Sequence, residues 1–184
     1  HPKRKTKVVF VQLGSPSEPT TKALRKYLKK FLGDPRVIDI NPWLWKIILN
    51  FFVLPFRPKK SAKLYARIWD GKSFPLITNT RDFTNSVREE LKKIDPNGHV
   101  EVNHAFLLSP PYVNEVYDSW ENDLKKGIGA TKLLVIPMFP QYSESTIASG
   151  IDALAKELSK RVKIPTFEVI TNFHRTHAFI DNSV

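Results

Sequence analysis

Short apolar runs rich in β-branched residues alternate with segments of helical length along the whole chain, and this alternation constrains the fold most. The two clearest runs are Lys7–Leu13 and Lys132–Phe139, and a turn residue, Gly14 or Pro140, follows each of them. Short continuous apolar runs are typical of strands that are buried on both faces of a sheet. Strands that alternate with helices predict a parallel sheet with helices on both sides.

The remaining pattern divides the chain into further strands and helices. Thr20 or Thr21 is a suitable N-cap for the first helix, and Asn41-Pro42 for the second. The sequence predicts one α/β domain over residues 1–184 with a four-stranded parallel sheet, without internal repeats or low-complexity linkers. The other expected strands are 99–106 and 166–170, and the expected helices are 20–31, 41–53, 59–69, 79–94, 113–124 and 143–161, with a last one beginning near Thr176.

The chain combines a lack of cysteine with a strong excess of positive charge. Without cysteine, thiol catalysis, disulfides and cysteine-ligated clusters are excluded. The 29 Lys and Arg against 18 Asp and Glu give a formal net charge of +11, which favours anionic partners. Nucleic acid is the usual partner at this charge, but no nucleic-acid-binding motif accompanies it, so none is expected here.

Ligands of open parallel sheets bind beyond the carboxyl ends of the strands. In this chain those ends are 13–15, 106–108 and 138–140, and their residues are mainly apolar. Neither the glycine-rich fingerprint of dinucleotide-binding folds nor a P-loop is present. The pattern therefore favours an apolar ligand surface over a ring of acids and bases.

The segment Pro42–Phe56 is unusually apolar for a surface helix. In helical geometry Leu44, Ile47 and Phe51 share a face with Ile48, and this face is the one that a domain core would bury. Trp45, Leu49 and Phe52 then point elsewhere, so the helix must be covered on two sides or contact something apolar. At about 1.5 Å per residue the helix is too short to span a bilayer, but it is long enough to lie in the interface.

Five basic residues follow this segment before the next acid, Asp70. Two interpretations stay open for residues 41–67: a core helix with a solvated charged face, or an apolar membrane-facing lip with a basic rim. The basic residues are Arg57, Lys59, Lys60, Lys63 and Arg67.

Few side chains suggest acid–base or metal chemistry. His104 lies in a predicted strand, which favours a packed histidine over a catalytic base. His174 and His177 have helical spacing, but no carboxylate pair accompanies them, so no metal site is predicted. Ser143 and Ser145 lack the G-x-S-x-G elbow of a serine nucleophile.

Several stretches, collinear over essentially the whole chain, resemble ferrochelatases. Phe139–Thr146 (FPQYSEST) is similar to the family's YPQYSxST signature, and Phe31–Ile38 (FLGDPRVI) to its FLxDPRVI stretch. Leu13–Pro16 resembles the family's first strand-to-loop motif. Further matches are Leu54–Ala62 with Tyr65, Ile68 and Trp69 in the lip region, Phe74–Leu76 in the SPL turn, and Phe173–Ile180 in the stretch that leads to the second lobe.

The resemblance implies a Rossmann-like three-layer αβα lobe of a two-lobed chelatase that inserts Fe²⁺ into protoporphyrin IX. This chain would be the N-terminal lobe, and it would supply a wall of the porphyrin cleft and a lip that contacts an anionic membrane surface. Three sets of residues are implied. They are Leu13, Arg67, Thr80, Leu107 and Phe139 for the porphyrin; Gln141, Tyr142, Ser143, Ser145 and Thr146 for the signature loop; and Trp43, Trp45, Ile48, Phe51 and Phe52 for the lip.

The chain departs from the family pattern at three points. The family's catalytic histidine and its glutamate partner would lie beyond Val184 in the second lobe, so these residues alone are expected to be inactive. Leu107-Leu108 replaces an Arg-Tyr pair of the family, which favours a degenerate, non-catalytic porphyrin- or membrane-binding module as the alternative function. Glu144 stands where some members have a cluster-ligating cysteine, so no iron–sulfur cluster or other cofactor is expected.

The first apolar run is too short for a signal peptide, and no segment reaches the roughly 20 apolar residues of a membrane-spanning helix. A cytoplasmic location at the periphery of a membrane is expected.

Overall fold

The computed structural model describes residues 5–127 and 130–181, which fall into two compact units. Unit 1 contains residues up to 12, residues 80–107 and residues from 111 on. Unit 2 contains residues 13–79 together with 108–110. The predicted lip segment lies wholly within unit 2.

Unit 1 is built on a sheet of four parallel strands, as the sequence predicts. The structure gives their order as β2-β1-β3-β4. The central strand β1 pairs with β2 and with β3 in one continuous register, so that Val8 lies between Val102 and Leu134. The strands are β1 (Thr6–Gln12), β2 (Val100–Phe106), β3 (Lys132–Pro137) and β4 (Thr166–Val169).

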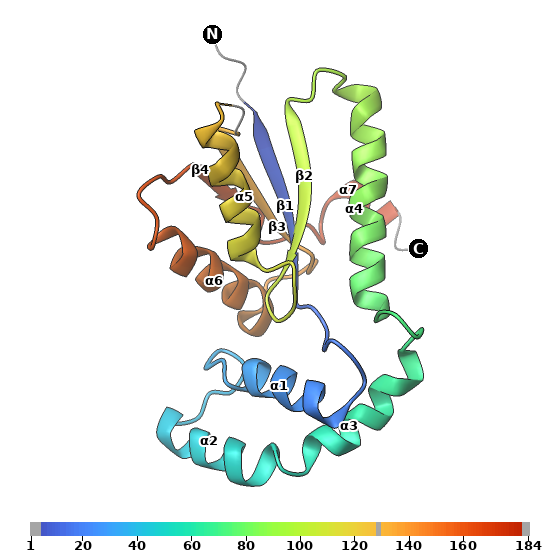
Figure 1. Ribbon diagram of the computed structural model, residues 1–184. Coiled ribbons are helices and arrows are strands. Elements are labelled where there is room, and N and C mark those ends of the chain that lie inside the picture. The colour runs from blue at the N-terminus through green and yellow to red at the C-terminus, as the bar shows by residue number, and fades with distance from the viewer. Residues whose placement is uncertain (1–4, 128–129, 182–184) are drawn as a thin grey trace. The chain divides into compact units, whose positions relative to one another are not determined.

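Helices cover both faces of this sheet (Figure 1), which gives the expected three-layer αβα architecture. On one face α4 (Pro75–Ile94) places Val87 and Leu91 against Phe10 and its neighbours. On the other face α5 (Val113–Lys125) and α6 (Ser149–Leu158) form the largest apolar cluster. A short helix, α7 (His177–Asp181), follows β4.

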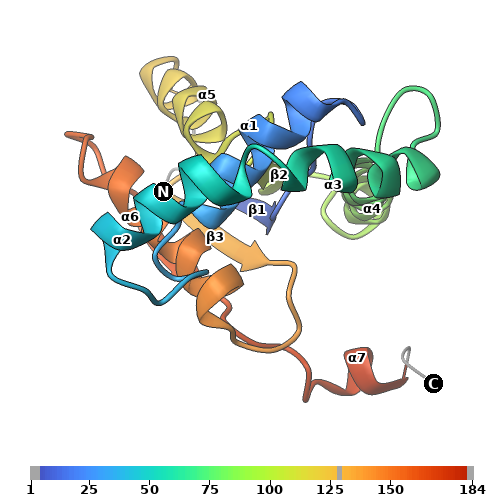
Figure 2. The same ribbon diagram turned by 90° about the horizontal axis from the view of Figure 1, so that it is seen from below.

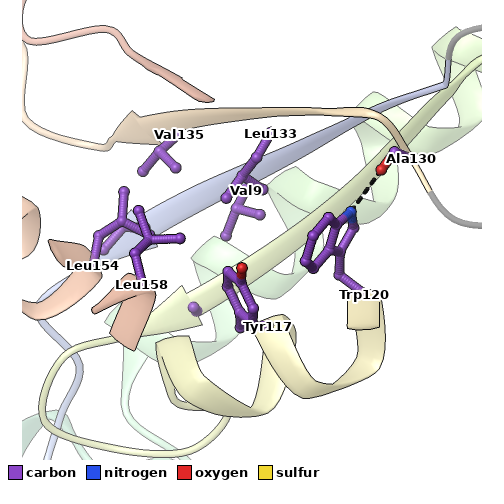
Figure 3. Close-up of a cluster of buried hydrophobic side chains, with 10 residues drawn as sticks. Val9, Tyr117, Trp120, Ala130, Leu133, Val135, Leu154 and Leu158 are labelled. Carbon is purple, nitrogen blue, oxygen red and sulfur yellow. Dashed lines mark hydrogen bonds between the residues drawn. The ribbon is translucent and has the colours of Figure 1, made fainter. Parts of the chain in front are cut away.

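The cluster under α5 and α6 contains the bulkiest side chains of this layer (Figure 3). Tyr117 and Trp120 of α5 meet edge to face with ring centroids 4.9 Å apart. The Trp120 indole N–H donates to the carbonyl of Ala130 at 2.7 Å, so the polar atom of this buried ring is satisfied. Leu154 and Leu158 of α6 pack against the same core.

Unit 2 is helical, and its first two helices begin at the predicted caps. In α1 (Thr21–Leu32) the Thr20 hydroxyl accepts a hydrogen bond from the Ala23 N–H, and in α2 (Pro42–Ile48) the Asn41 side chain accepts from Trp43 and Leu44. A π-helical turn, Leu49–Val53, continues α2. Next comes α3 (Arg57–Tyr65), which lies beside α1 (Figure 2).

Most predicted boundaries hold, and the differences have local causes. Helix α4 begins at Pro75 instead of near residue 79, because proline is well suited to the first turn of a helix. The predicted helix 143–161 begins with a π-helical turn, Glu144–Ala148, and α6 ends at Leu158. The predicted helix 59–69 begins at Arg57 and finishes in a 3₁₀ turn, Ala66–Ile68.

The face of the Pro42–Val53 helix that unit 2 buries is not the predicted one. Leu44, Ile47 and Phe51 are 54%, 52% and 71% exposed. Instead Leu49 and Trp45 turn inward, and the Trp45 indole N–H donates to the Leu32 carbonyl at 2.6 Å. The carbonyl end of α1 thus gives the Trp45 ring both an apolar contact and a hydrogen-bond partner.

Candidate functional site

The carboxyl ends of three strands in unit 1 are held together by hydrogen bonds that continue past the strands. After β2, the Leu107 N–H donates to the Gln12 carbonyl of β1 at 3.0 Å. After β3, the Met138 N–H donates to the Val11 carbonyl of β1 at 2.8 Å. After β4, the Ile170 N–H donates to the Val135 carbonyl of β3 at 3.0 Å. The loops after β2, β3 and β4 therefore leave the sheet from a common edge, which is where ligands of parallel sheets bind.

The signature loop follows β3 at this edge and is tightly folded on itself. The Ser143 carbonyl accepts hydrogen bonds from the N–H groups of Thr146, Ile147 and Ala148, which starts the π-helical turn. The Ser143 and Ser145 hydroxyls are 3.1 Å apart. Gln141 and Tyr142 precede this turn and are exposed. Short π-helical turns are frequent at functional sites.

Thr146 has an unusual hydroxyl for this loop. Its Oγ1 is buried, and it has no hydrogen-bond partner among the described residues. A buried hydroxyl without a partner costs about 1–3 kcal/mol, so such groups usually serve a purpose besides stability.

A segment from the end of the chain braces the same loop. The N–H groups of Phe173 and His174 both donate to the Pro140 carbonyl at 3.1 Å. The His174 Nδ1 also lies 3.2 Å from this carbonyl, so it bonds the loop when it carries the proton. Phe139 itself is half-buried at the start of the loop.

Leu107 and Leu108, which replace an arginine and a tyrosine of the family pattern, both pack into apolar clusters. Leu107 packs against the α5–α6 cluster of unit 1, and Leu108 packs against the apolar cluster of unit 2 around Leu28 and Leu54. Each leucine thus contributes to a core, which neither a guanidinium nor a phenol would do without a polar partner.

In unit 2 the turn after β1 is fixed by two hydroxyls. Gly14 has φ of +92°, a backbone conformation that favours glycine. Its carbonyl accepts a hydrogen bond from the Tyr27 hydroxyl at 3.3 Å, and the next N–H, that of Ser15, donates to the Ser109 hydroxyl at 3.3 Å. Burial, and then the neighbouring Tyr65, raise the pKa of Tyr27, so this phenol keeps its proton as a donor.

Unit 2 carries the most exposed aromatic side chains of the described chain. Trp43, Phe51, Phe52 and Phe56, which we call the aromatic surface, are 78%, 71%, 67% and 69% exposed. Among the other predicted lip residues, Trp45 packs inward and Ile48 is half-buried. Clustered exposure of large apolar side chains marks an interaction surface.

The remaining predicted contacts lie in both units. Leu13 is half-buried and Arg67 is exposed, and both belong to unit 2. Thr80 is 6% exposed in α4, and its carbonyl accepts a hydrogen bond from the Thr84 hydroxyl at 2.7 Å. Thr80, Leu107 and Phe139 belong to unit 1. A porphyrin site that combines residues of the two units stays a prediction.

Among the histidines of unit 1, His104 takes a structural position. His104 packs edge to face on Phe106, with ring centroids 5.5 Å apart. Burial lowers the pKa of His104, and the charges of Arg88 and Arg81 lower it further, so the imidazole is neutral near pH 7. His177 is exposed at the first residue of α7, and His174 precedes this helix. Within residues 5–127 and 130–181, no three histidine, aspartate or glutamate side chains cluster as metal ligands would.

None of the described helices is both long enough and apolar enough to cross a bilayer.

The parallel sheet with helices on both faces places the chain in the class of Rossmann-like α/β proteins, and comparisons with known proteins identify the family. The ferrochelatase family model matches residues 5–184. Ferrochelatase from Idiomarina loihiensis is 41% identical over 174 residues, which are 95% of this chain and 46% of that protein. Ferrochelatase from Actinobacillus pleuropneumoniae is 39% identical over 94% of this chain and 52% of its own length.

The chain therefore belongs to the ferrochelatase family. It is also 38% identical, over 96% of its length and 53% of the relative, to a coproporphyrin III ferrochelatase from Streptococcus mutans. The chain thus spans about half the length of the curated relatives that it matches.

Sequence reasoning identifies the strand ends and the signature loop but not the residues that brace them. In the sequence Tyr27 is only one of the apolar positions of a helix, and no sequence pattern marks Ser109 as a residue that supports the site. Their roles depend on contacts with Gly14 and Ser15, which are 13 and 94 residues away in the chain.

Proposed function

We propose that the chain forms the N-terminal lobe of a ferrochelatase that inserts Fe²⁺ into protoporphyrin IX in haem biosynthesis. The observation that carries this proposal is the aromatic surface of unit 2, in a chain of the ferrochelatase family. Protoporphyrin is flat, apolar and soluble in membranes, so an enzyme that acts on it benefits from an apolar surface at the bilayer interface.

The predicted site residues divide by chemistry. Leu13, Leu107 and Phe139 provide apolar side chains for the macrocycle. Arg67 and Thr80 provide a guanidinium and a hydroxyl for the propionates. The signature loop shapes the edge of the site, and its Thr146 hydroxyl is buried without a partner among the described residues.

The reaction exchanges two pyrrole protons for Fe²⁺, which is a substrate here and not a resident cofactor. The lobe binds and orients the ring, while a base of the second lobe accepts the protons as the metal enters. These 184 residues contain no cysteine that could ligate an iron–sulfur cluster, and the proposal assigns them no cofactor. The proposed partners are the second lobe and an anionic membrane surface, which the protein contacts from the cytoplasm as a peripheral protein.

A chimeric enzyme tests the catalytic proposal. Residues 5–184 replace the matching half of the Idiomarina loihiensis ferrochelatase, and insertion of Fe²⁺ into protoporphyrin and into coproporphyrin is followed spectroscopically. We expect turnover with protoporphyrin by the chimera and only background by the 184-residue chain alone, because the proton-accepting groups belong to the second lobe. Turnover by the isolated chain contradicts this division of roles.

The packing of Leu107 and Leu108 favours a second candidate, a lobe that binds porphyrin without catalysis. The same chimera separates the two candidates. If it binds protoporphyrin without turnover, and the double substitution Leu107→Arg with Leu108→Tyr restores turnover, the non-catalytic function holds. If the unmodified chimera is active, that candidate is rejected.

The membrane contact is tested by vesicle sedimentation with the 184-residue chain. We expect binding to vesicles that contain phosphatidylserine and a loss of about tenfold or more when Trp43 and Phe52 are replaced by serine, since each buries an aromatic ring in the interface. The matched control replaces Ile94 and Val162, which are 78% and 100% exposed in unit 1, by serine. Equal binding by the two variants refutes the assignment of the aromatic surface.

A further inference from the structure

The positive charge of the chain is concentrated in unit 2. Unit 2 holds 13 Lys and Arg and 4 Asp and Glu, a net charge of +9. The rest of the chain holds 16 Lys and Arg and 14 Asp and Glu, a net charge of +2. The overall net charge of +11 therefore comes mainly from about two fifths of the residues.

The two units also differ in how their charges are paired. In unit 1 lysines of α4 and α6 sit beside carboxylates of the same helix, with N–O distances of 2.8 Å for Lys92–Glu89 and 2.6 Å for Lys156–Asp152. In unit 2 three of the four carboxylates accept other hydrogen bonds: Asp34 and Asp70 accept from backbone N–H groups, and Glu18 accepts from the Thr20 hydroxyl. Little acidic charge is left to neutralise the cations of unit 2.

The exposed side of α1 is a continuous basic stripe, which we call the α1 stripe. It lies opposite the buried side that carries Leu24, Tyr27 and Leu28. The stripe consists of Lys22, Arg25, Lys26, Lys29 and Lys30.

The α1 stripe is unfavourable for the helix by itself. Lys22, Arg25, Lys26 and Lys29 form no ion pair within unit 2. Like charges three and four residues apart repel one another on a helix. The first turn has no acidic residue, and Lys22 lies there beside the positive pole of the helix dipole, whereas the dipole favours Lys29 and Lys30 in the last turn. Such an arrangement suits a surface whose negative charge comes from a partner.

We infer that the α1 stripe is a second contact with an anionic bilayer, electrostatic in nature and separate from the aromatic surface. This inference rests on the proposed membrane contact of unit 2. A bilayer is favoured over an acidic protein because the same compact unit exposes Trp43, Phe51 and Phe52, which suit an interface with lipid. Nucleic acid is disfavoured because the stripe has no aromatic side chain on which bases stack.

The two contacts have different roles. The aromatic surface buries apolar area and holds the protein at the interface, whereas the stripe acts over about one Debye length without insertion. Helix α1 is 12 residues long, about 18 Å, so the stripe reaches several lipid headgroups at once. Binding through the stripe therefore depends on salt and on the fraction of acidic lipid.

The test compares two fourfold substitutions in the 184-residue chain that change the net charge equally. The stripe variant carries Lys22→Gln, Arg25→Gln, Lys26→Gln and Lys29→Gln. The control variant carries Lys92→Gln, Lys93→Gln, Lys156→Gln and Lys160→Gln, which removes paired lysines of unit 1. Sedimentation with vesicles of phosphatidylcholine and phosphatidylserine, at low and at physiological salt, gives the partition coefficients.

We expect the stripe variant to bind the vesicles at least about tenfold more weakly than the parent, since each cation near an anionic bilayer raises the affinity for that bilayer about fivefold. The partition coefficient of the control variant should fall less than about threefold, because of the general effect of net charge. Far-ultraviolet circular dichroism checks that the stripe variant keeps its helices. We expect it to do so because removal of repelling charges stabilises α1.

Each other outcome overturns a defined claim. If the parent does not bind the vesicles at all, the proposed membrane contact fails and the inference falls with it. If the parent binds and the stripe and control variants bind equally, only the role of the stripe fails. A stripe variant that binds vesicles like the parent but loses affinity for a single-stranded oligonucleotide or for polyglutamate assigns the stripe to that polymer and refutes the bilayer.

Discussion

At the scale of single residues, Thr146 is the side chain of the signature loop whose chemistry is least explained by packing. Its hydroxyl is buried without a partner among the described residues, whereas Thr84, also buried, donates its hydroxyl hydrogen to the Thr80 carbonyl at 2.7 Å. The two threonines offer a matched pair, because valine has the same shape and lacks only the hydroxyl.

Thr146→Val is expected to leave the free energy of unfolding unchanged or to raise it by about 1 kcal/mol, since it removes an unsatisfied buried group. Thr84→Val should lower that free energy by about 1 kcal/mol, since it removes a formed hydrogen bond. Urea unfolding of the 184-residue chain measures both. In the chimeric enzyme Thr146→Val should reduce turnover. If Thr146→Val destabilises the fold as much as Thr84→Val, the hydroxyl has a structural role.

At the scale of elements, the buried Trp120 ring and its hydrogen bond help to hold α5 on the sheet. Trp120 is 3% exposed, and its indole N–H satisfies the Ala130 carbonyl just before β3 begins. The contact therefore joins a helix to the start of the strand whose other end leads into the signature loop (Figure 3).

Trp120→Phe is expected to lower the free energy of unfolding by about 2–4 kcal/mol, because it leaves a carbonyl unsatisfied and opens a cavity beside Tyr117. Trp43→Phe is the control, since Trp43 is 78% exposed and surface changes usually stay within about 0.5 kcal/mol. Chemical unfolding followed by circular dichroism gives both values. If Trp120→Phe lowers the free energy of unfolding no more than Trp43→Phe does, the structural role assigned to the Trp120 ring is contradicted.

At the scale of the whole molecule, the two units divide the properties of the chain. Unit 1 holds the parallel sheet with the predicted ligand edge, and its Lys92 and Lys156 are paired with carboxylates of their own helices. Unit 2 holds the aromatic surface and most of the excess positive charge. The proposed function, insertion of Fe²⁺ into a porphyrin delivered from a membrane, would use both sets of properties.

Much of this organisation is readable from the sequence, because it depends on neighbours in the chain. The β-branched run of β3, the caps at Thr20 and Asn41, and the alternation of strands and helices all act within a few residues. They predict the parallel three-layer architecture. The motif Phe139–Thr146 predicts the family, since its residues are contiguous.

Tertiary contacts decided which side chains face inward and what holds the site in place. Residues 42–53 are apolar nearly all round, so their periodicity does not select a face, and the carbonyl of Leu32 selects it by bonding Trp45. The support of the Gly14 turn by Tyr27 and Ser109 likewise joins segments that are distant in the chain. The sequence determined where helices and strands form, because those preferences are local. Only the folded chain determined the partners of each polar group, because burial makes a hydrogen bond necessary and distance in the sequence does not predict which group will supply it.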